Sequence, residues 1–243
     1  MNIYTQFGET RQYGLKQWRD SNLSRYDFKR IPKHIGVIPD GNRRWAQGNG
    51  LGKEEGYQYG IRPGFELYEL CIELGISELT LYGFTQDNTK RPKVQRKAFQ
   101  RACVDAVQML AERDADLLVV GNTQSDMFPR ELLPYTYERV RFGRGLLKVN
   151  FLVNYSWQWD LHQAISAVNR GGKNVTDIIG SFLISRVDLM IRWGGRRRLS
   201  GFLPVQSIYS DFYIIEELWP DFKRQHLLEA LSWYQKQDIT LGG

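Results

Sequence analysis

Six short apolar runs, separated by longer segments of helical period, set the architecture of this 243-residue chain. The apolar runs, each typical of a buried strand, lie at 35–38, 79–84, 117–120, 146–153, 187–191 and 212–215. The segments with helical spacing lie at 64–74, 92–115, 129–141, 159–168 and 221–237. Because strands that alternate with helices are joined by right-handed crossovers, they form a mostly parallel sheet. The sequence therefore predicts an α/β protein with a central sheet of about six strands flanked by helices.

The chain is predicted to form a single domain. Its length suits one large domain or two small ones, and no repeat, low-complexity tract or long linker divides it. We assign residues 31–243 to the domain and residues 1–30 to an N-terminal extension without an interpretable motif. The extension has no apolar core like that of a signal peptide, and no run approaches the ~20 apolar residues of a membrane span. We therefore expect a cytoplasmic protein.

Composition excludes several kinds of site. Two cysteines, Cys71 and Cys103, are too few for a disulfide scaffold or a cysteine-based zinc site. The three histidines are widely spaced, and the chain has no nucleophile-elbow or Walker motif. Lysine and arginine number 33 against 27 aspartate and glutamate residues, which gives a formal net charge of +6. This charge favours anionic partners: nucleic acid, acidic lipid or phosphorylated small molecules.

Ligands of parallel sheets bind beyond the carboxyl ends of the strands, and an Asp-Gly-Asn-Arg-Arg segment (40–44) follows the first strand. Unpaired amides at the start of a helix, together with Arg43 and Arg44, suit an anion. Asp40 suits magnesium, which prefers one or two carboxylates plus phosphate oxygens. Taken alone, the segment is explained equally well as a turn and helix cap.

The segment after the fifth strand contains two glycines and four arginines between Arg192 and Ser200. It has three interpretations: a solvated basic loop, an RNA-binding loop in which Trp193 and Phe202 stack on bases, or a bidentate grip on a diphosphate. Its position at the carboxyl end of a strand favours the diphosphate. The polar loop 85–91 and Asp211, by themselves, are better explained as a turn and an exposed acid.

Taken together, four blocks in collinear order resemble the cis-prenyltransferases of the undecaprenyl diphosphate synthase family. Residues 34–46 are similar to the family signature H-x-x-x-I-x-D-G-N-x-R-W-A. Residues 79–92 resemble its L-T-x-Y-x-F-S-x-E-N-x-x-R-P block, and Asn154 and Tyr155 resemble the start of N-Y-G-G-R. Residues 188–222 resemble its D-L-x-I-R-x-G-G-x-x-R-x-S-x-F-L block and the segment that follows it.

The resemblance implies a magnesium-dependent transferase that joins isopentenyl diphosphate to an allylic prenyl diphosphate. The allylic diphosphate is ionised or displaced at C1, isopentenyl diphosphate attacks, and loss of a proton leaves a Z double bond. The resemblance also implies a hydrophobic product tunnel, a homodimer and peripheral membrane contact through the lipid product. No nucleic acid partner is expected.

The resemblance also assigns roles to residues at matching positions. It implies catalytic roles for Asp40, Asn42, Thr85 and Asn88. It implies a substrate-binding set made of Gly41, Arg43, Arg44, Trp45, Lys53, Tyr57, Arg91, Arg192, Arg198 and Ser200. It implies that Asp40 and Asp211 hold Mg²⁺.

The chain also departs from the family pattern, mostly on the side of isopentenyl diphosphate. The departures are Tyr57 for histidine, Thr89 for tryptophan, 156–158 for Gly-Gly-Arg, Arg196 for glutamate, Gly201 for asparagine, Asp211 for glutamate, and a C-terminus (239–243) without the family's tail arginine. Arg196 and Arg197 are candidates to replace that tail arginine. Open alternatives are an elongating synthase, a short-chain synthase, an irregular head-to-middle coupling enzyme, a non-catalytic subunit and an RNA-binding protein. The sequence predicts neither product length nor primer.

Overall fold

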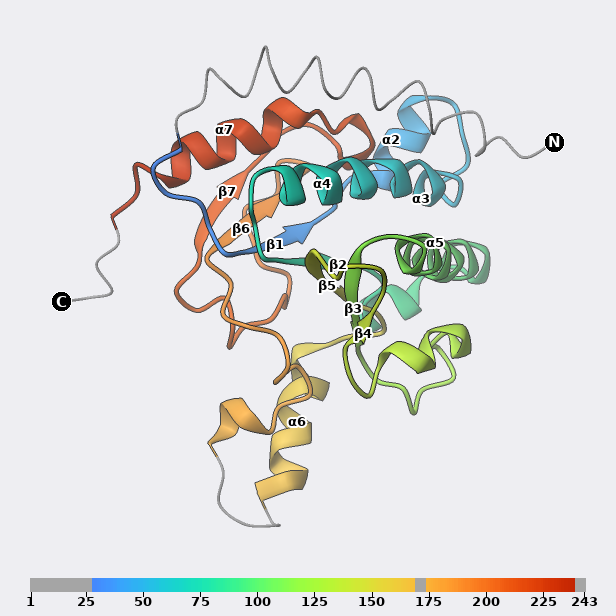
Figure 1. The fold of residues 1–243 in the computed structure, drawn as a ribbon. Coiled ribbons are helices and arrows are strands. Elements are labelled where there is room, and N and C mark those ends of the chain that lie inside the picture. Colours follow the sequence, from blue (N-terminus) through green and yellow to red (C-terminus); the bar gives the residue numbers. More distant parts are fainter. Residues whose placement is uncertain (1–27, 169–173, 239–243) are drawn as a thin grey trace.

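The computed structural model describes residues 28–168 and 174–238. This part of the chain forms a seven-stranded sheet in the order β4-β3-β5-β2-β1-β6-β7 (Figure 1). The strands are β1 (His34–Ile38), β2 (Glu78–Tyr82), β3 (Ala115–Val120), β4 (Val140–Arg141), β5 (Leu147–Leu152), β6 (Leu189–Arg192) and β7 (Asp211–Ile214). All neighbours pair in parallel except β4, which runs antiparallel to β3. The predicted mostly parallel α/β sheet is confirmed, with β4 as an additional strand at its edge.

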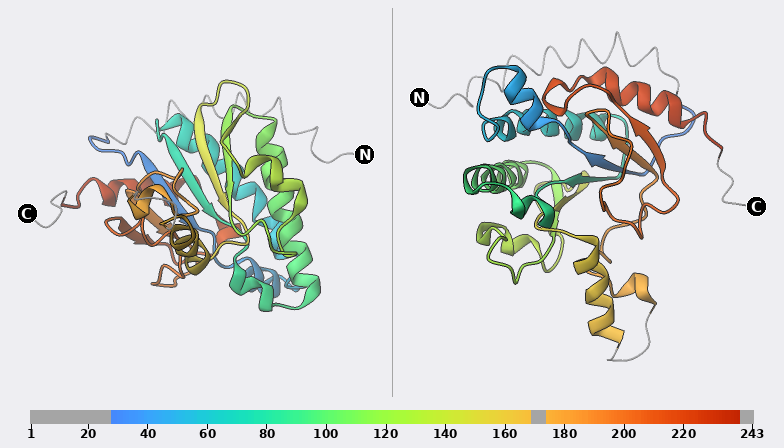
Figure 2. Two further views of the ribbon diagram at one scale, coloured as in Figure 1. Left: turned by 90° about the horizontal axis from the view of Figure 1, so that it is seen from below. Right: turned by 180° about the vertical axis from the view of Figure 1, so that it is seen from behind.

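Helices cover both faces of the sheet. They are α2 (Asn42–Gly48), α3 (Gly56–Tyr59), α4 (Ile61–Glu73), α5 (Lys93–Ala111), α6 (Trp157–Val168) and α7 (Arg224–Tyr234), with short 3₁₀ turns η3 (Gln86–Lys90), η4 (Arg130–Tyr135), η5 (Val175–Asp177) and η6 (Trp219–Asp221). Helices α4, α5 and α7 lie over one face, and α6 lies on the other side (Figures 1 and 2). None of the helices in the described residues is both long and apolar enough to span a membrane.

The strands are buried on both faces, which is why they appear in the sequence as nearly continuous apolar runs. In β3, Leu117 and Val119 pack into the core beneath α4, α5 and α7, whereas Leu118 and Val120 pack into the core on the opposite face. Alternate side chains of β3 therefore pack into the cores on the two faces of the same sheet.

The prediction of a helix at 129–141 is wrong. Residues 130–135 form the 3₁₀ turn η4, and Pro134 lies inside it. Proline lacks a backbone N–H and clashes with the preceding helical turn, so an α-helix does not continue through this segment. The chain instead extends and pairs β4 with β3, where Arg141 Nε donates to Asp116 Oδ1 at 3.0 Å.

The other element boundaries differ by a few residues. The second strand ends at Tyr82 rather than at residue 84, and α5 ends at Ala111 rather than at 115. The last helix begins at Arg224 because the segment Trp219–Asp221 is the separate turn η6. The predicted N-terminal extension lies outside the described residues except for 28–30.

A buried polar network crosses β1, β2 and β5. Thr80 Oγ1 lies 2.8 Å from both His34 Nε2 and Asn150 Nδ2, and Asn150 Nδ2 also donates to Glu78 Oε1 at 2.8 Å. His34 Nδ1 faces the carbonyls of Ser185 and Arg186 at 3.1 and 3.2 Å. These partners assign the proton of a neutral imidazole to Nδ1, because Asn150 donates to the Thr80 hydroxyl and that hydroxyl then donates to Nε2.

This network makes the stability of the fold depend on pH. Burial lowers the pKa of His34 below its ordinary 6.5, against the opposing effects of Glu78, the two carbonyls and Asp188. For Glu78, burial alone raises the pKa, but His34, hydrogen bonds from Asn150 and Ser185, and Arg139 outweigh it and lower the pKa. As the pH falls below about 6.5, the unfolded chain therefore binds a proton at His34 more readily than the folded chain does.

We expect the free energy of unfolding in urea to fall as the pH drops from 7.5 to 5.5. The same decrease should be smaller in His34→Gln, which removes the titrating ring but keeps hydrogen-bonding atoms. The comparison requires urea titrations of both proteins at each pH. Equal pH dependence in both proteins would show that another group controls this transition.

Candidate active site

The carboxyl ends of three neighbouring strands place the predicted residues together. Strand β1 lies between β2 and β6 and runs parallel to both, so the segments that follow these strands leave the same edge of the sheet. Asp40 follows β1, Thr85 follows β2, and Arg192 ends β6. The site is therefore assembled from segments about 150 residues apart in sequence by strand pairing alone.

Arg192 connects the first and last motifs. Its Nη2 donates to Asp40 Oδ2 at 2.7 Å, and its Nη1 donates to Ser200 Oγ at 2.8 Å and to the carbonyl of Arg198. Arg192 is only 4% exposed, whereas the Asp40 side chain is 32% exposed. One guanidinium thus holds the carboxylate and the loop 193–201 in fixed relation, and leaves the carboxylate accessible from one side.

A glycine of this loop, Gly194, allows a second arginine to approach. Gly194 and Gly195 have φ values of 83° and 70°, a conformation that favours glycine. A Cβ at Gly194 would lie 2.4 Å from Arg44 Nη2, which donates to the Gly194 carbonyl at 3.0 Å. The same Arg44 Nη2 lies 3.4 Å from Asp40 Oδ1. Arg44 and Arg192 therefore face both carboxylate oxygens of Asp40.

Arg91 lies on the opposite side of the site, beside Tyr57. Its Nη1 donates to the Tyr57 hydroxyl at 2.8 Å, and burial lowers the pKa of Arg91 despite the opposing effect of Tyr57. Burial raises the pKa of Tyr57, so its hydroxyl stays protonated at neutral pH and has its own proton left to donate. Tyr57 therefore orients Arg91 without neutralising it.

The loop after β2 is ordered by its own side chains. Asn88 Oδ1 accepts a hydrogen bond from the Thr85 backbone N–H at 3.0 Å, and the Thr85 side chain caps the start of η3 in return. Thr85 also pairs with Tyr155 in an isolated parallel bridge. These contacts hold Thr85 and Asn88 at the rim of the site.

All but two of the predicted site residues line one cavity of about 520 Å³, which we call the cationic basin. They are Asp40, Gly41, Asn42, Arg43, Arg44, Lys53, Tyr57, Thr85, Asn88, Arg91, Arg192, Arg198 and Ser200. The basin is lined by two carboxylates, those of Asp40 and Asp87. It is also lined by seven cationic side chains, those of Arg43, Arg44, Lys53, Arg91, Arg192, Arg196 and Arg198. This excess of positive charge suits a ligand with several negative charges, such as a diphosphate.

Arg196 and Arg197, the candidates to replace the missing tail arginine, lie differently. Arg196 lines the cationic basin. Arg197 Nη2 instead lies 2.7 Å from Glu216 Oε1, in an ion pair in which both side chains are mostly exposed. Arg196 therefore adds positive charge to the basin, whereas Arg197 forms an ion pair on the exposed side of the loop.

Trp45 and Asp211 lie outside the basin lining. Trp45 Nε1 donates to Asp221 Oδ1 at 2.8 Å, and its ring packs on Tyr59. Asp211 begins β7 in register with Leu189 of β6, which pairs with Ile35 near the start of β1. Asp211 thus lies at the amino end of the sheet, opposite Asp40, and the predicted metal pair is not formed within one chain. In the part of the chain that the structure describes, no group of three or more histidine, cysteine, aspartate or glutamate side chains is arranged for a metal ion.

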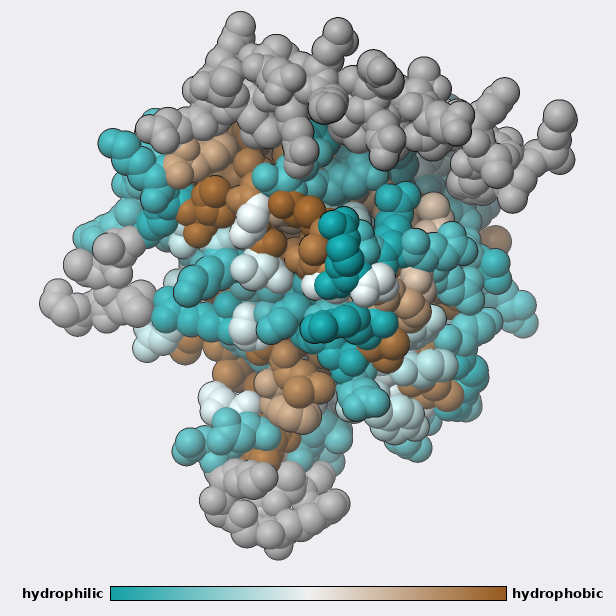
Figure 3. All heavy atoms as spheres, in the orientation of Figure 1, coloured by the Kyte–Doolittle hydropathy of each residue, from teal (hydrophilic) through white to brown (hydrophobic). Residues whose placement is uncertain are grey.

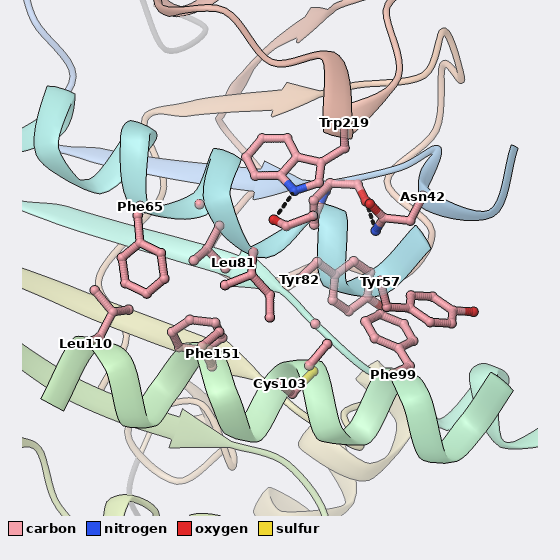
Figure 4. Close-up of a pocket in the computed structure, with 17 residues that line it drawn as sticks. Asn42, Tyr57, Phe65, Leu81, Tyr82, Phe99, Cys103, Leu110, Phe151 and Trp219 are labelled. Carbon is pink, nitrogen blue, oxygen red and sulfur yellow. Dashed lines mark hydrogen bonds between the residues drawn. The ribbon is translucent and has the colours of Figure 1, made fainter. Parts of the chain in front are cut away.

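A second, apolar cavity adjoins the basin between α4 and α5 (Figure 4). We call this space of about 80 Å³ the apolar chamber. In Figure 4, Tyr57 and Phe99 lie at one end, and Phe65, Leu110 and Phe151 lie towards the other. Phe99 lines both cavities, and sequence analysis did not single it out, because an apolar residue within a long amphipathic helix is normally assigned to the core.

Comparison with known proteins places these features in a family. Residues 38–242 match the family model of undecaprenyl diphosphate synthase. The chain is 35% identical over 232 residues to cis-prenyltransferase 4, chloroplastic, of Solanum lycopersicum, a match that covers 87% of this chain and 75% of the relative. It is 33% identical over 232 residues to an isoprenyl transferase of Chlorobaculum tepidum, covering 87% and 86%.

A solved structure is similar as well. It is the crystal structure of lavandulyl diphosphate synthase from Lavandula x intermedia in complex with dimethylallyl diphosphate. It superposes with a TM-score of 0.76 at 25% sequence identity, over 87% of this chain and 98% of the other.

Proposed function

Because this chain belongs to the undecaprenyl diphosphate synthase family of prenyltransferases, we propose that it condenses isopentenyl diphosphate with an allylic prenyl diphosphate. The product is a Z prenyl diphosphate, and free diphosphate is released. The observation that carries this proposal is the junction of the cationic basin with the apolar chamber. One cavity suits diphosphate groups and the other suits a hydrocarbon tail.

The residues of the basin support cleavage of the allylic C1–O bond. Negative charge builds on the departing diphosphate as this bond breaks, and preorganised cations stabilise that charge. Arg43, Arg44 and Arg91 line the basin, and Arg91 donates a hydrogen bond to Tyr57, which lines both cavities; these arginines suit the allylic diphosphate. Arg192, Arg198 and Ser200, which are joined by hydrogen bonds, suit isopentenyl diphosphate. The carbon nucleophile then forms the new C–C bond, and a proton is lost from the adjacent carbon.

Magnesium fits this site with Asp40 as its protein ligand. The Asp40 carboxylate opens into the basin, and magnesium is commonly held by one carboxylate and substrate phosphate oxygens. Bound there, the ion neutralises charge on the leaving diphosphate. Asp211 takes no part in this proposal, because it lies at the other end of the sheet in the same chain.

A second candidate function is irregular coupling, in which a second allylic diphosphate replaces isopentenyl diphosphate. Two observations favour it. The similar structure is a lavandulyl diphosphate synthase that binds dimethylallyl diphosphate. The departures from the family pattern at Arg196, Gly201 and 156–158 lie on the side assigned to the acceptor.

A product assay with the purified protein distinguishes these functions. The protein is incubated with magnesium and dimethylallyl, geranyl or farnesyl diphosphate, with and without isopentenyl diphosphate, and products are identified by mass spectrometry. We expect product only when isopentenyl diphosphate is present, and its loss when a chelator is added. Product from dimethylallyl diphosphate alone would support irregular coupling. No product from any combination would contradict both functions and favour the non-catalytic subunit.

Three further expectations stay predictions: the homodimer, the cytoplasmic location and membrane contact through the product. Figure 3 shows hydrophobic side chains at the surface where α6 joins the rest of the molecule. Trp157 and Ile165 of α6 are 43% and 65% exposed. Exposed apolar side chains of this size are often covered by a second subunit.

A further inference from the structure

The passage between the cationic basin and the apolar chamber is a neck with defined walls. The residues that line both cavities are Pro39, Asn42, Tyr57, Tyr82, Gly83 and Phe99. Tyr82 is fixed on one side of this neck, because its hydroxyl donates to the Ser200 carbonyl at 2.9 Å and its ring packs edge-on against Phe202. A tail that runs from a diphosphate in the basin into the chamber must therefore pass these six residues.

Tyr57 and Phe99 form the aromatic side of the neck. Their ring centroids lie 4.4 Å apart with an interplanar angle of 4°, so the rings are stacked (Figure 4). Phe84 packs edge-on against Phe99 with centroids 5.6 Å apart, which supports the stack from the sheet side. Because Tyr57 is on α3 and Phe99 is on α5, the stack closes the gap between these two helices.

The stack is also fixed from the basin. Arg91 Nη1 donates to the Tyr57 hydroxyl, and the Arg91 guanidinium lies 5.9 Å from the centroid of the Tyr57 ring and 5.5 Å from that of Phe99. Tyr57 is only 3% exposed and lies between the Arg91 guanidinium and the ring of Phe99. A substrate whose diphosphate binds Arg91 places its first isoprene unit beside this pair.

The chamber beyond the neck is small. It offers about 80 Å³ of space. At about 10–15 Å³ of such space for each water, it holds roughly five to eight water-sized groups. The five carbons of one isoprene unit fill this space, and Phe65, Leu110 and Phe151 line its far part.

We propose that the Tyr57–Phe99 stack is a specificity determinant that restricts this enzyme to allylic tails of about two isoprene units and to products of ten or fifteen carbons. This inference rests on the proposed prenyl diphosphate chemistry and assigns its substrate class. One unit lies in the neck beside the stack, and one fills the chamber. The phenyl ring of Phe99 has six carbons, so its removal frees space comparable to one further isoprene unit.

Tyr57 and Phe99 contribute in separable ways. The Phe99 ring supplies only a wall, whereas Tyr57 supplies a wall and the hydrogen bond to Arg91. Phe99→Ala therefore changes the length of tail that fits. Tyr57→Phe keeps the ring and removes the contact to Arg91, so it weakens the hold on the diphosphate for every tail alike.

The test is a binding series without isopentenyl diphosphate, which needs no turnover. Dissociation constants are measured by calorimetry for allylic diphosphates of five, ten, fifteen and twenty carbons. For the wild type we expect the tightest binding at ten carbons and at least about tenfold weaker binding at twenty. Phe99→Ala should move the optimum up by one isoprene unit, and Phe99→Leu, which keeps more of the packing, should move it in the same direction.

Tyr57→Phe and Phe142→Ala are the matched controls. Tyr57→Phe should weaken binding across the series and leave the optimum at ten carbons. Phe142 is also a partly buried phenylalanine packed on the same core, but it lies against Tyr135 and lines neither cavity. Phe142→Ala should lower the melting temperature without changing the length profile.

Failure of this inference and failure of the proposed function give different results. A wild-type affinity that rises steadily to twenty carbons, or a Phe99→Ala profile identical to that of the wild type, overturns the role of the stack. Long products from the wild type would do the same and leave the proposed function intact. A failed product assay contradicts the proposed function, whereas the binding series still decides whether the stack selects tail length.

Discussion

Replacing Asp40 with asparagine is expected to lower kcat/KM on the order of 1,000-fold with little change in melting temperature. Asparagine has nearly the same shape, so Gly41 and α2 keep their positions. The substitution removes the negative charge that faces Arg44 and Arg192 and opens into the basin. The Asp40 side chain is partly exposed, so loss of its charge affects one buried group, the Arg192 guanidinium. Arg192 keeps its contacts to Ser200 and the Arg198 carbonyl.

Asp87 provides the matched control for Asp40. It is the other carboxylate of the basin, but its side chain is 83% exposed and pairs with Lys90 at 2.7 Å. Asp87→Asn removes the same charge from the same cavity and should change kcat/KM by no more than a few-fold, since exposed ion pairs contribute little. Steady-state kinetics at several magnesium concentrations measure both variants. Near-normal turnover in Asp40→Asn would contradict the assigned role of this carboxylate.

The sequence was sufficient to predict how the site is assembled. In a parallel sheet the carboxyl ends of neighbouring strands meet at one edge, so residues that follow the strands converge even when they are far apart in the chain. Asp40, Thr85 and Arg192 follow or end three strands, and all three line the cationic basin. The apolar strands were equally predictable, because burial on both faces leaves an uninterrupted apolar run.

Other features depend on pairing that no local pattern encodes. Asp211 is adjacent to a predicted strand, but only the register of β7 on β6 reveals that it lies at the amino end of the sheet. The helix predicted at 129–141 had a helical apolar spacing, yet Pro134 and the two-residue pairing of β4 with β3 determined the outcome. The stack of Tyr57 on Phe99 joins two helices across a gap, and its geometry follows from tertiary packing alone.

Replacing Arg192 with lysine is expected to lower kcat/KM by about 100- to 1,000-fold although the charge is kept. The guanidinium contacts three acceptors at once: Asp40 Oδ2, Ser200 Oγ and the Arg198 carbonyl. An ammonium is a compact point charge and does not reproduce this planar fork. Arg192 itself is buried, and a lysine in its place would leave a buried cation with fewer hydrogen-bond partners, so we also expect a lower melting temperature.

Arg197→Lys is the control, because Arg197 belongs to the same loop but pairs with Glu216 on the exposed side. It should change kcat/KM less than about twofold, as expected for a surface ion pair. If Arg192→Lys affected only stability, kcat/KM would recover at a temperature where the variant is fully folded. We expect the deficit to persist there, because Arg192 positions Asp40 relative to Ser200 and to the arginines of the basin. Full activity in Arg192→Lys would mean that positive charge alone is sufficient at this position and that the fixed geometry between the two motifs is not required for the reaction.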